Sequence, residues 1–526
     1  MALPATGVIE IRQSATANNV NGGGFNSARG GTDYTLQDAS QLTNTDGAST
    51  ASTTFTSALA TFTSAMVGNY LHLVSATGTP TLGWYEIVTF TDANNVVLDR
   101  TSGTYTLGTF HVGGAMSLNS TLDDDLFEIG IEGNIFYIKY SASTFVLGEA
   151  VSITATGGVQ KPIEVIGYNT TRGDNPTGAN RPTVSCGANS LIFALNWQTS
   201  NIIFTGTGSP MVNFSSGNSK GVNCKYKNTS TAVDRGAVTN NGVDLFLVNC
   251  ELISYRGKAI ATTSNVLLAV GCYLHASNMG LSVRVSTYTL VDCIISDNVT
   301  SAVNFEVANT GRTNIINSTL YGSENTTGTA FAVFTGTTDI TLLNNIIYGF
   351  TDGVNHPDVQ SVGFDDYNCY FNNDTDVTNW TKGSNDVATN PTFTSVSQLT
   401  GVNASVSGSV ITATGAFGSV TDNVDYFYLI SGTGATAGMY GITSHTADTA
   451  TLDIAPGGSG TNISWQITTG HNFAVGTNMK ALGFPGSFSG ALSTGYMDIG
   501  AVQRQEPTGG SGGLLINPGL AGGMNG

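Results

Sequence analysis

Residues 247–298 read LVNCELISYRGKAIATTSNVLLAVGCYLHASNMGLSVRVSTYTLVDCIISDN and hold three cysteines at nearly even intervals. Cys250, Cys272 and Cys293 each follow an Asn, Gly or Asp and precede a short apolar run. The same pattern extends outward to four further positions, namely Cys224 upstream and Ser318, Asn345 and Cys369 downstream. The successive intervals are 26, 22, 21, 25, 27 and 24 residues. A period in the low twenties with short strands and turn residues indicates a repeat architecture.

Each repeat also holds a second apolar run, such as DLFLV, NVLLAV or DITLL, and no stretch of the region has a sustained helical period. We therefore predict an all-β fold, a right-handed parallel β-helix whose coils contain two or three short strands. Residues one period apart then stack about 4.8 Å from each other. Cys224, Cys250, Cys272 and Cys293 are predicted to form an interior ladder, with Cys186 outside its register. Disulfides and a zinc site remain alternatives, although Ser318 and Asn345 at the same position disfavour both.

The stack is predicted to begin with coils at residues 133–153 and 161–169. The preceding stretch STLDDDLFEIG, residues 120–130, is expected to form a short helix that covers the open end of the solenoid. Thr121 is its predicted N-cap, and Asp123 to Asp125 lie in the first turn, where the helix dipole favours acidic side chains. Calcium binding by these aspartates is the alternative.

A second repeat is independent of the first. The stretch that begins at Tyr70 and the stretch that begins at Tyr426 share one skeleton. Its matched pairs are Gly78 with Gly434, Gly83 with Gly438, Tyr85 with Tyr440, and Asp99 with Asp453. Each copy is predicted to form three strands of a small antiparallel module, which needs support from its neighbours.

Composition limits the class of protein. Of the 526 residues 40% are hydrophobic and only 10% are charged, and the net charge is -18. Such an acidic chain is repelled by nucleic acid and by anionic membranes, so we expect neither as a partner. We find no apolar run long enough to span a membrane and expect no signal peptide at the N-terminus.

These patterns predict six segments. They are an N-terminal strand with a Gly-rich lead-in (1–45), the first β module (46–117), the parallel β-helix with its capping helix (118–395), the second β module (396–470), C-terminal closing strands (471–504) and a flexible Gly-rich tail (505–526).

Several stretches carry a family resemblance. They are NGGGFNSARGGTDYT at 21–35, GWYEIVTF at 83–90, IEVIGYNTTRGDNPTGANRPTV at 163–184 and GYMDIGAVQR at 495–504. Together they resemble right-handed β-helix repeat proteins of the pectate-lyase-like superfamily, in the versions carried by tailed bacteriophages and viral contigs. The resemblance implies a trimeric spike, a fibre or a capsid-surface protein, or else a polysaccharide lyase or hydrolase.

Enzymes of this fold need acidic and basic side chains gathered on one sheet. The charged residues of the coils, such as Glu251 and Lys225, are expected not to share a column. The best acidic cluster is FDDYNCYFNNDTD. It supplies four weak catalytic candidates, Asp365, Asp366, Asp374 and Asp376, for which Asx-turns are the favoured interpretation.

Three other motifs favour a structural interpretation. The six histidines are too scattered for a metal site, and Arg172-Gly173-Asp174 is interpreted as a loop with an Arg–Asp pair. A column of tyrosines after the ladder position is a candidate sugar-stacking stripe, with packing as the favoured alternative. Its members are Tyr255, Tyr273, Tyr321, Tyr348 and Tyr370.

We therefore predict a non-enzymatic structural protein of a phage-like virion, exposed on the particle as a capsid decoration, fibre or spike. A depolymerase tailspike, either a polysaccharide hydrolase or a lyase, is the alternative. The expected partners are two further copies in a homotrimer, other virion proteins and host surface polysaccharide. No cofactor and no metal are expected.

Overall fold

The computed structural model describes residues 3–502 apart from several gaps. The gaps are 5–6, 15, 118–129, 148–150, 154–160, 194–195, 216, 231, 233–235, 263–265, 285–286, 307–310, 323–327, 335–338, 358–362, 397, 469–470, 477–478, 480–482 and 484–497. The predicted capping helix falls almost wholly in the gap at 118–129 and so lies outside the described residues. By its contacts the chain forms two compact units, residues 1–287 and 288–526.

Nearly all regular structure is β. The helices of the described residues are single 3-10 turns: η1 (Ser27–Arg29), η2 (Tyr34–Leu36), η3 (Ser64–Met66) and η4 (Gly178–Asn180). None of the helices in this part of the chain has the length and apolar character needed to cross a membrane.

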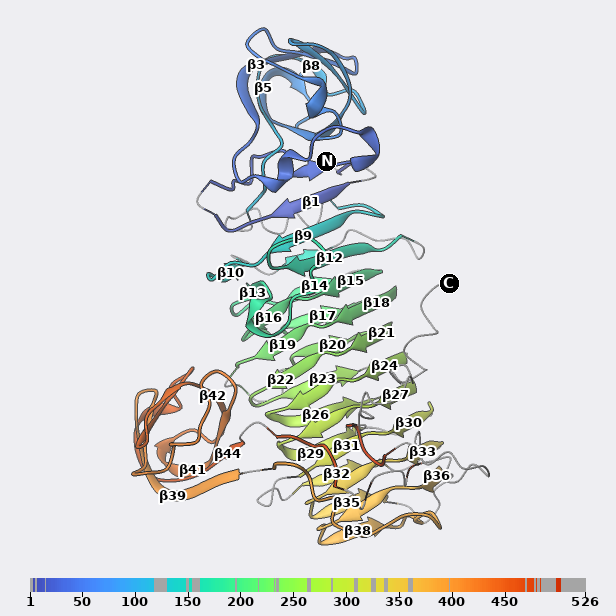
Figure 1. Cartoon of the computed structure of the whole chain (residues 1–526), viewed down its shortest axis with the longest axis vertical. Coiled ribbons are helices and arrows are strands. Elements are labelled where there is room, and N and C mark those ends of the chain that lie inside the picture. Colours follow the sequence, from blue (N-terminus) through green and yellow to red (C-terminus); the bar gives the residue numbers. More distant parts are fainter. Residues whose placement is uncertain are drawn as a thin grey trace, which may run out of the picture. The chain divides into compact units, whose positions relative to one another are not determined.

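The first unit contains a solenoid of three parallel sheets, whose strands follow one another as rungs (Figure 1). Sheet 1 contains β1 (Val8–Ile11), β9 (Ile135–Lys139), β12 (Ile163–Tyr168), β15 (Trp197–Ser200), β18 (Gly217–Val222), β21 (Val243–Val248) and β24 (Val266–Val270), with β2 (Gly24–Phe25) antiparallel to β1. Sheet 2 contains β10 (Phe145–Val146), β13 (Thr183–Ser185), β16 (Ile203–Gly206), β19 (Lys225–Asn228), β22 (Glu251–Ser254) and β25 (Tyr273–His275). Sheet 3 contains β11 (Val151–Ile153), β14 (Leu191–Phe193), β17 (Val212–Phe214), β20 (Val238–Asn240), β23 (Lys258–Thr262) and β26 (Ser277–Val283).

The second unit repeats this three-sheet arrangement. Its sheet 1 strands are β27 (Thr287–Val291), β30 (Thr313–Ile316), β33 (Ile340–Leu343) and β36 (Gly363–Asp366). Its sheet 2 strands are β28 (Ile294–Ser296), β31 (Thr319–Tyr321), β34 (Ile346–Tyr348) and β37 (Cys369–Phe371), and its sheet 3 strands are β29 (Asn298–Phe305), β32 (Thr329–Ala332), β35 (Asp352–Asn355) and β38 (Thr375–Thr378). The predicted parallel β-helix is confirmed.

From β15 onward, two residues form each corner between a sheet 1 strand and the following sheet 2 strand. The first of the two has left-handed backbone geometry, with φ between 50° and 61°. These residues are Asn201, Asn223, Asn249, Gly271, Asp292, Asn317, Asn344 and Tyr367. Asn, Asp and Gly are the residues that adopt this conformation most readily. The recurring Asn, Gly or Asp before the ladder position is therefore the corner itself, and Tyr367 takes this place before Asn368.

The second corner residue points inward and forms the ladder. Cys224, Cys250, Cys272 and Cys293 are buried free thiols at this position, as the sequence predicts. The assignment of Cys369 to the ladder is wrong by one residue. Ile346 pairs with Cys369, so the ladder residue of that coil is Asn368.

Each predicted β module is part of a closed six-stranded antiparallel barrel. Barrel 1 contains β3 (Leu42–Thr50), β4 (Thr54–Thr56), β5 (Tyr70–Pro80), β6 (Gly83–Asp92), β7 (Asn95–Leu98) and β8 (Gly103–Val112). Barrel 2 contains β39 (Gln398–Ser407), β40 (Val410–Thr412), β41 (Tyr426–Ala435), β42 (Gly438–His445), β43 (Thr449–Leu452) and β44 (Gly457–Thr468). The sequence predicts β5 to β7 and β41 to β43, and the structure adds the three strands that close each barrel.

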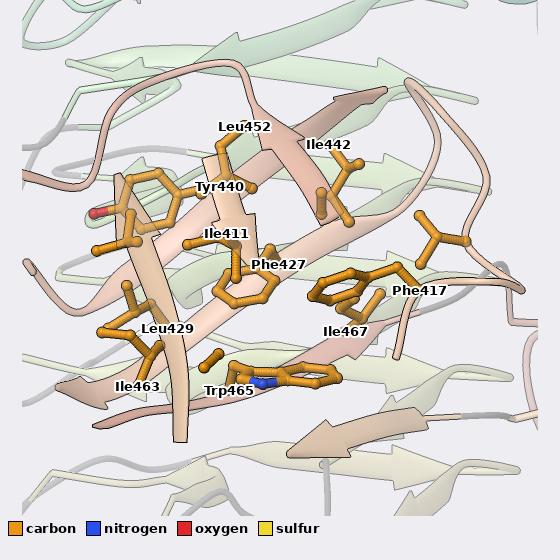
Figure 2. Close-up of a cluster of buried hydrophobic side chains, with 14 residues drawn as sticks. Ile411, Phe417, Phe427, Leu429, Tyr440, Ile442, Leu452, Ile463, Trp465 and Ile467 are labelled. Atoms are coloured by element: carbon orange, nitrogen blue, oxygen red, sulfur yellow. The ribbon is translucent and has the colours of Figure 1, made fainter. Parts of the chain in front are cut away.

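The matched residues make the same contacts in both barrels. The Tyr85 hydroxyl donates to the Thr81 carbonyl, and the Tyr440 hydroxyl donates to the Thr436 carbonyl. Asp99 accepts from the Glu86 N–H at 3.0 Å, as Asp453 does from the Gly441 N–H at 3.0 Å. Figure 2 shows the interior of barrel 2, where Phe417, Phe427 and Trp465 pack together. The duplication predicted from the sequence is thus a duplication of packing as well.

Candidate functional site

The four predicted acidic candidates lie near the C-terminal end of the solenoid. Asp365 and Asp366 end β36, Asp374 precedes β38, and Asp376 lies within it. Asp366 accepts from the backbone N–H and the side chain of Asn385, both at 2.9 Å.

The other two candidates differ from each other in their contacts. Asp376 accepts from the Lys382 ammonium at 2.8 Å and from the Asn373 amide at 3.1 Å. Asp374 is exposed, and its backbone N–H donates to the Phe350 carbonyl at 3.0 Å. Asp366 and Asp376 thus join neighbouring segments of chain, through contacts that are not the i to i+2 bonds of an Asx-turn.

Asp365 is the one candidate of the four that is buried. Its carboxylate accepts from the Tyr370 hydroxyl at 2.6 Å, from the Asn368 amide at 2.7 Å and from the Trp380 indole N–H at 2.5 Å. A second carboxyl group, that of Asp386, lies nearby, because the same Asn368 amide also donates to it at 3.5 Å. Burial raises the pKa of Asp386 to about 8, and the neighbouring Asp365 adds to the shift. The Asp386 carboxyl group is therefore protonated near neutral pH.

Sequence reasoning missed Asp386, which continues the ladder. Its neighbour Val387 forms a parallel bridge with Cys369, so Asp386 follows Asn368 in the column. From Cys293 onward, each backbone N–H in this column donates to the side-chain oxygen of the next ladder residue. The donor–acceptor pairs are Cys293 to Ser318 at 3.2 Å, Ser318 to Asn345 at 2.9 Å, Asn345 to Asn368 at 2.8 Å and Asn368 to Asp386 at 2.7 Å. Asp386 is the last acceptor of this series.

A second charged cluster lies on sheet 2 of the first unit. Lys225 is directly opposite Glu251, so the expectation that these residues do not share a column is wrong. Glu251 accepts from Lys225 at 2.9 Å and from His275 at 3.0 Å. Burial opposes ionisation of Glu251, but the His275 hydrogen bond and the Lys225 charge outweigh it, and its pKa is lowered. Burial lowers the pKa of Lys225. Lys225 and Glu251 thus form an ion pair, and His275 is hydrogen-bonded to the same carboxylate.

A third cluster surrounds Glu10, which is fully buried in β1. Its carboxylate accepts from Arg12 at 2.8 Å and from Arg172 at 2.9 Å, and the Tyr168 hydroxyl also donates to it. Arg172 belongs to the Arg-Gly-Asp tripeptide, but it pairs with Glu10 and Asp33 rather than with Asp174. Asp174 instead accepts from backbone N–H groups of residues 169–171. The Arg172 side chain therefore connects the loop after β12 to β1, the N-terminal strand of sheet 1.

The predicted tyrosine stripe is mostly buried. Tyr255, Tyr321 and Tyr370 are at most 4% exposed. Tyr321 stacks on Tyr348 with ring centroids 5.2 Å apart, and Phe393 and Phe473 pack against this pair edge-on. Packing thus accounts for these rings. Among the described residues no group of three or more His, Cys, Asp or Glu side chains is arranged to hold a metal ion.

Comparisons with known proteins give similarity of fold. No family model matches the chain, and no curated protein matches it. Solved structures with a similar fold include the pectate lyase Pel9A, 11% identical over 74% of this chain and 92% of that one with a TM-score of 0.35. The PL6 family alginate lyase AlyGC is 14% identical over 47% of this chain and 37% of that one, with a TM-score of 0.33. A tailspike protein of E. coli bacteriophage HK620 is 11% identical over 64% of this chain and 86% of that one, with a TM-score of 0.24.

Proposed function

We propose that the chain is a non-enzymatic structural protein of a phage-like virion, exposed on the particle as a capsid decoration, fibre or spike. The observation that carries the proposal is the structural use of its acidic side chains. Asp386 ends the ladder, Asp366 and Asp376 join segments of chain, and Glu251 and Glu10 are held in ion pairs. The virion assignment rests on the sequence resemblance described above.

The partners in this proposal are two further copies of the chain, other virion proteins and host surface polysaccharide. The two barrels support a role in binding these partners, because the same barrel fold is present twice and each copy has its own buried core. In both barrels the outer half of one long strand is exposed, at residues 75–79 of β5 apart from the partly buried Ala76, and at residues 431–434 of β41. These outer halves contain only Ser, Thr, Gly and Ala. Uncharged polar surface of this kind binds other surfaces without the cost of burying charge.

The location is tested by following the protein in particle preparations. Particles from a producing culture are separated on a density gradient, and fractions are probed with antibody raised against the full chain. We expect the protein to sediment with intact particles and immunogold to label their surface. Protein found only in the soluble or cell fractions contradicts the proposal.

A depolymerase is the second candidate, and the Asp365–Asp386 pair favours it. A carboxyl group with a pKa of about 8 is protonated at neutral pH and suits general acid catalysis. However, both carboxyl groups are held by one buried side chain, since the Asn368 amide donates to Asp365 at 2.7 Å and to Asp386 at 3.5 Å. The geometry therefore favours a structural carboxyl pair.

Reducing-sugar release from capsule, lipopolysaccharide and polyuronate separates the two candidates. We expect no turnover by the full chain on any of these substrates. Turnover that is lost in Asp365→Asn and kept in Asp244→Asn, a matched change on sheet 1, establishes the depolymerase instead.

A further inference from the structure

Barrel 2 is joined to the solenoid by two segments, residues 391–396 before β39 and residues 471–476 after β44. We call this pair of segments the neck. Its two chains are bonded to each other, with the Thr394 N–H donating to the Ala474 carbonyl at 2.9 Å and Ser395 and Asn472 forming an antiparallel bridge. The chains that enter and leave barrel 2 therefore act as one element.

The neck packs on the outer face of sheet 2 through aromatic rings. Phe393 and Phe473 contact each other at 5.3 Å, and both contact the ring of Tyr321, at 6.0 and 5.3 Å. Val475 belongs to a buried cluster with Ile346. These apolar contacts do not respond to pH.

One ion pair in the neck does respond to pH. The Nε2 atom of His471 lies 3.4 Å from the Asp297 carboxylate, and both side chains are at most 2% exposed. Asp297 is the left-handed corner residue after β28, and it also accepts from the Ser296 hydroxyl at 2.7 Å. The pair therefore connects the neck directly to a solenoid corner.

The Asp297 carboxylate favours the charged form of His471, whereas burial opposes it, as does the buried Nδ1 atom, which has no hydrogen-bond partner among the described residues. Burial lowers the pKa of His471, but the charge and hydrogen bond of Asp297 outweigh burial, Asp425 acts in the same direction, and the pKa is raised. Among the described residues, the charged or titratable groups facing His471 are Asp297, Asp425 and Tyr321. No Lys or Arg occurs between residues 383 and 479, so the neck and barrel 2 contain no cation to replace the imidazolium.

We propose that the neck is a pH-sensitive latch, docked on sheet 2 while His471 is protonated and loosened when His471 loses its proton. The docked state binds the proton more tightly than the undocked state, because docking raises the pKa of His471. Docking is therefore strongest below the pKa of a free histidine and weakens as the pH rises through the raised value. The latch gives barrel 2 more freedom at higher pH and holds it at lower pH.

Hydrogen exchange of the full chain, corrected for intrinsic rates and measured from pH 5 to pH 9, tests the latch. We expect protection of peptides from 391–396 and 471–476 to fall by up to about tenfold per pH unit, the limit for one proton. Asp297→Asn moves the fall to lower pH. His471→Gln abolishes the pH dependence and leaves the neck weakly protected throughout. His445→Gln is the matched control, since that histidine is in barrel 2 and pairs with the exposed Asp422, and it leaves the profile unchanged.

Two outcomes overturn the proposal. The first is a neck whose protection has the same pH profile in the native chain and in His471→Gln. The second is loss of protection in β41 and β44 together with the neck, which indicates unfolding of barrel 2 rather than release.

Discussion

At the scale of single residues, the fold depends on a two-residue corner. A left-handed Asn, Asp or Gly is followed by an inward side chain, and the chain then enters sheet 2. The inward residue changes from Cys293 to Ser318, Asn345 and Asn368 along the second unit. The sequence shows the spacing of this column, but it does not show that the polar members hydrogen-bond to one another. These hydrogen bonds depend on which residue of each coil occupies the ladder. The Asn-Cys motif at 368–369 suggests Cys369, whereas the ladder residue is Asn368.

Replacing Asn345 tests the hydrogen-bonded part of the ladder. In Asn345→Ala the Ser318 N–H and the Ile315 carbonyl both lose a buried partner. We expect the free energy of unfolding to fall by about 2–4 kcal/mol, the cost of two unsatisfied buried groups and a small cavity. Urea denaturation measures the change. Cys272→Ala, at an apolar position of the same ladder, is the control and costs about 1 kcal/mol. Equal losses in the two variants contradict the hydrogen-bonded ladder.

The Asp365–Asp386 pair predicts a pH dependence of stability. The folded-state pKa of Asp386, about 8, lies above the unfolded value, so its contribution is complete below about pH 4 and is lost as the pH rises through about 8. Asp386→Asn keeps an oxygen acceptor for Asn368 and carries no charge. We expect this variant to be more stable than the native chain at pH 9, by on the order of 1–2 kcal/mol after allowance for solvent screening. Urea midpoints at pH 5 and pH 9 measure the difference, and a variant that is less stable than the native chain at pH 9 rules out the raised pKa of Asp386.

At the scale of elements, sequence reasoning succeeds where one local pattern repeats. The parallel strands and β5 to β7 are predicted because apolar residues and glycines recur at fixed offsets. The strands that close the barrels are missed because β3 and β39 are built largely from Thr, Ser, Asn and Gly, which resemble loops. The pairing of Lys225 with Glu251 was within reach, since their separation of 26 residues equals that of Cys224 and Cys250. The contact between Asp386 and Asn368 could not be predicted in this way, because Asp386 lies outside the regular strands, where the repeated pattern ends.

The close packing inside barrel 2 predicts that Gly401 in β39 does not tolerate a larger side chain. A Cβ atom at Gly401 lies 2.5 Å from the Trp465 ring, so Gly401→Ala overpacks the core of barrel 2. We expect a loss of about 1–3 kcal/mol in local stability, measured as faster hydrogen exchange in peptides from β39 and β44. Gly458→Ala is the control, because a Cβ atom there meets nothing within 4 Å. If both variants exchange like the native chain, the close contact between β39 and Trp465 is refuted.

At the scale of the whole molecule, the low content of charge governs assembly. Only 10% of the residues are charged, so most polar side chains are uncharged, and surfaces built from them associate without burying charge. The net charge of -18 opposes assembly, because three chains placed side by side repel one another. A closed homotrimer held by uncharged faces is therefore expected to become tighter as salt screens the repulsion.

Light scattering across salt concentrations measures this balance. We expect a mass of three times 54.4 kDa at micromolar concentration in 0.15 M salt, because the uncharged faces then outweigh a repulsion that is largely screened beyond about 8 Å. The trimer fraction should fall when the salt is lowered to 0.01 M, where the screening length grows to about 30 Å. The opposite trend, dissociation at high salt, indicates an interface held by ion pairs. A single-chain mass at every salt concentration shows that assembly depends on the particle and defeats the free trimer.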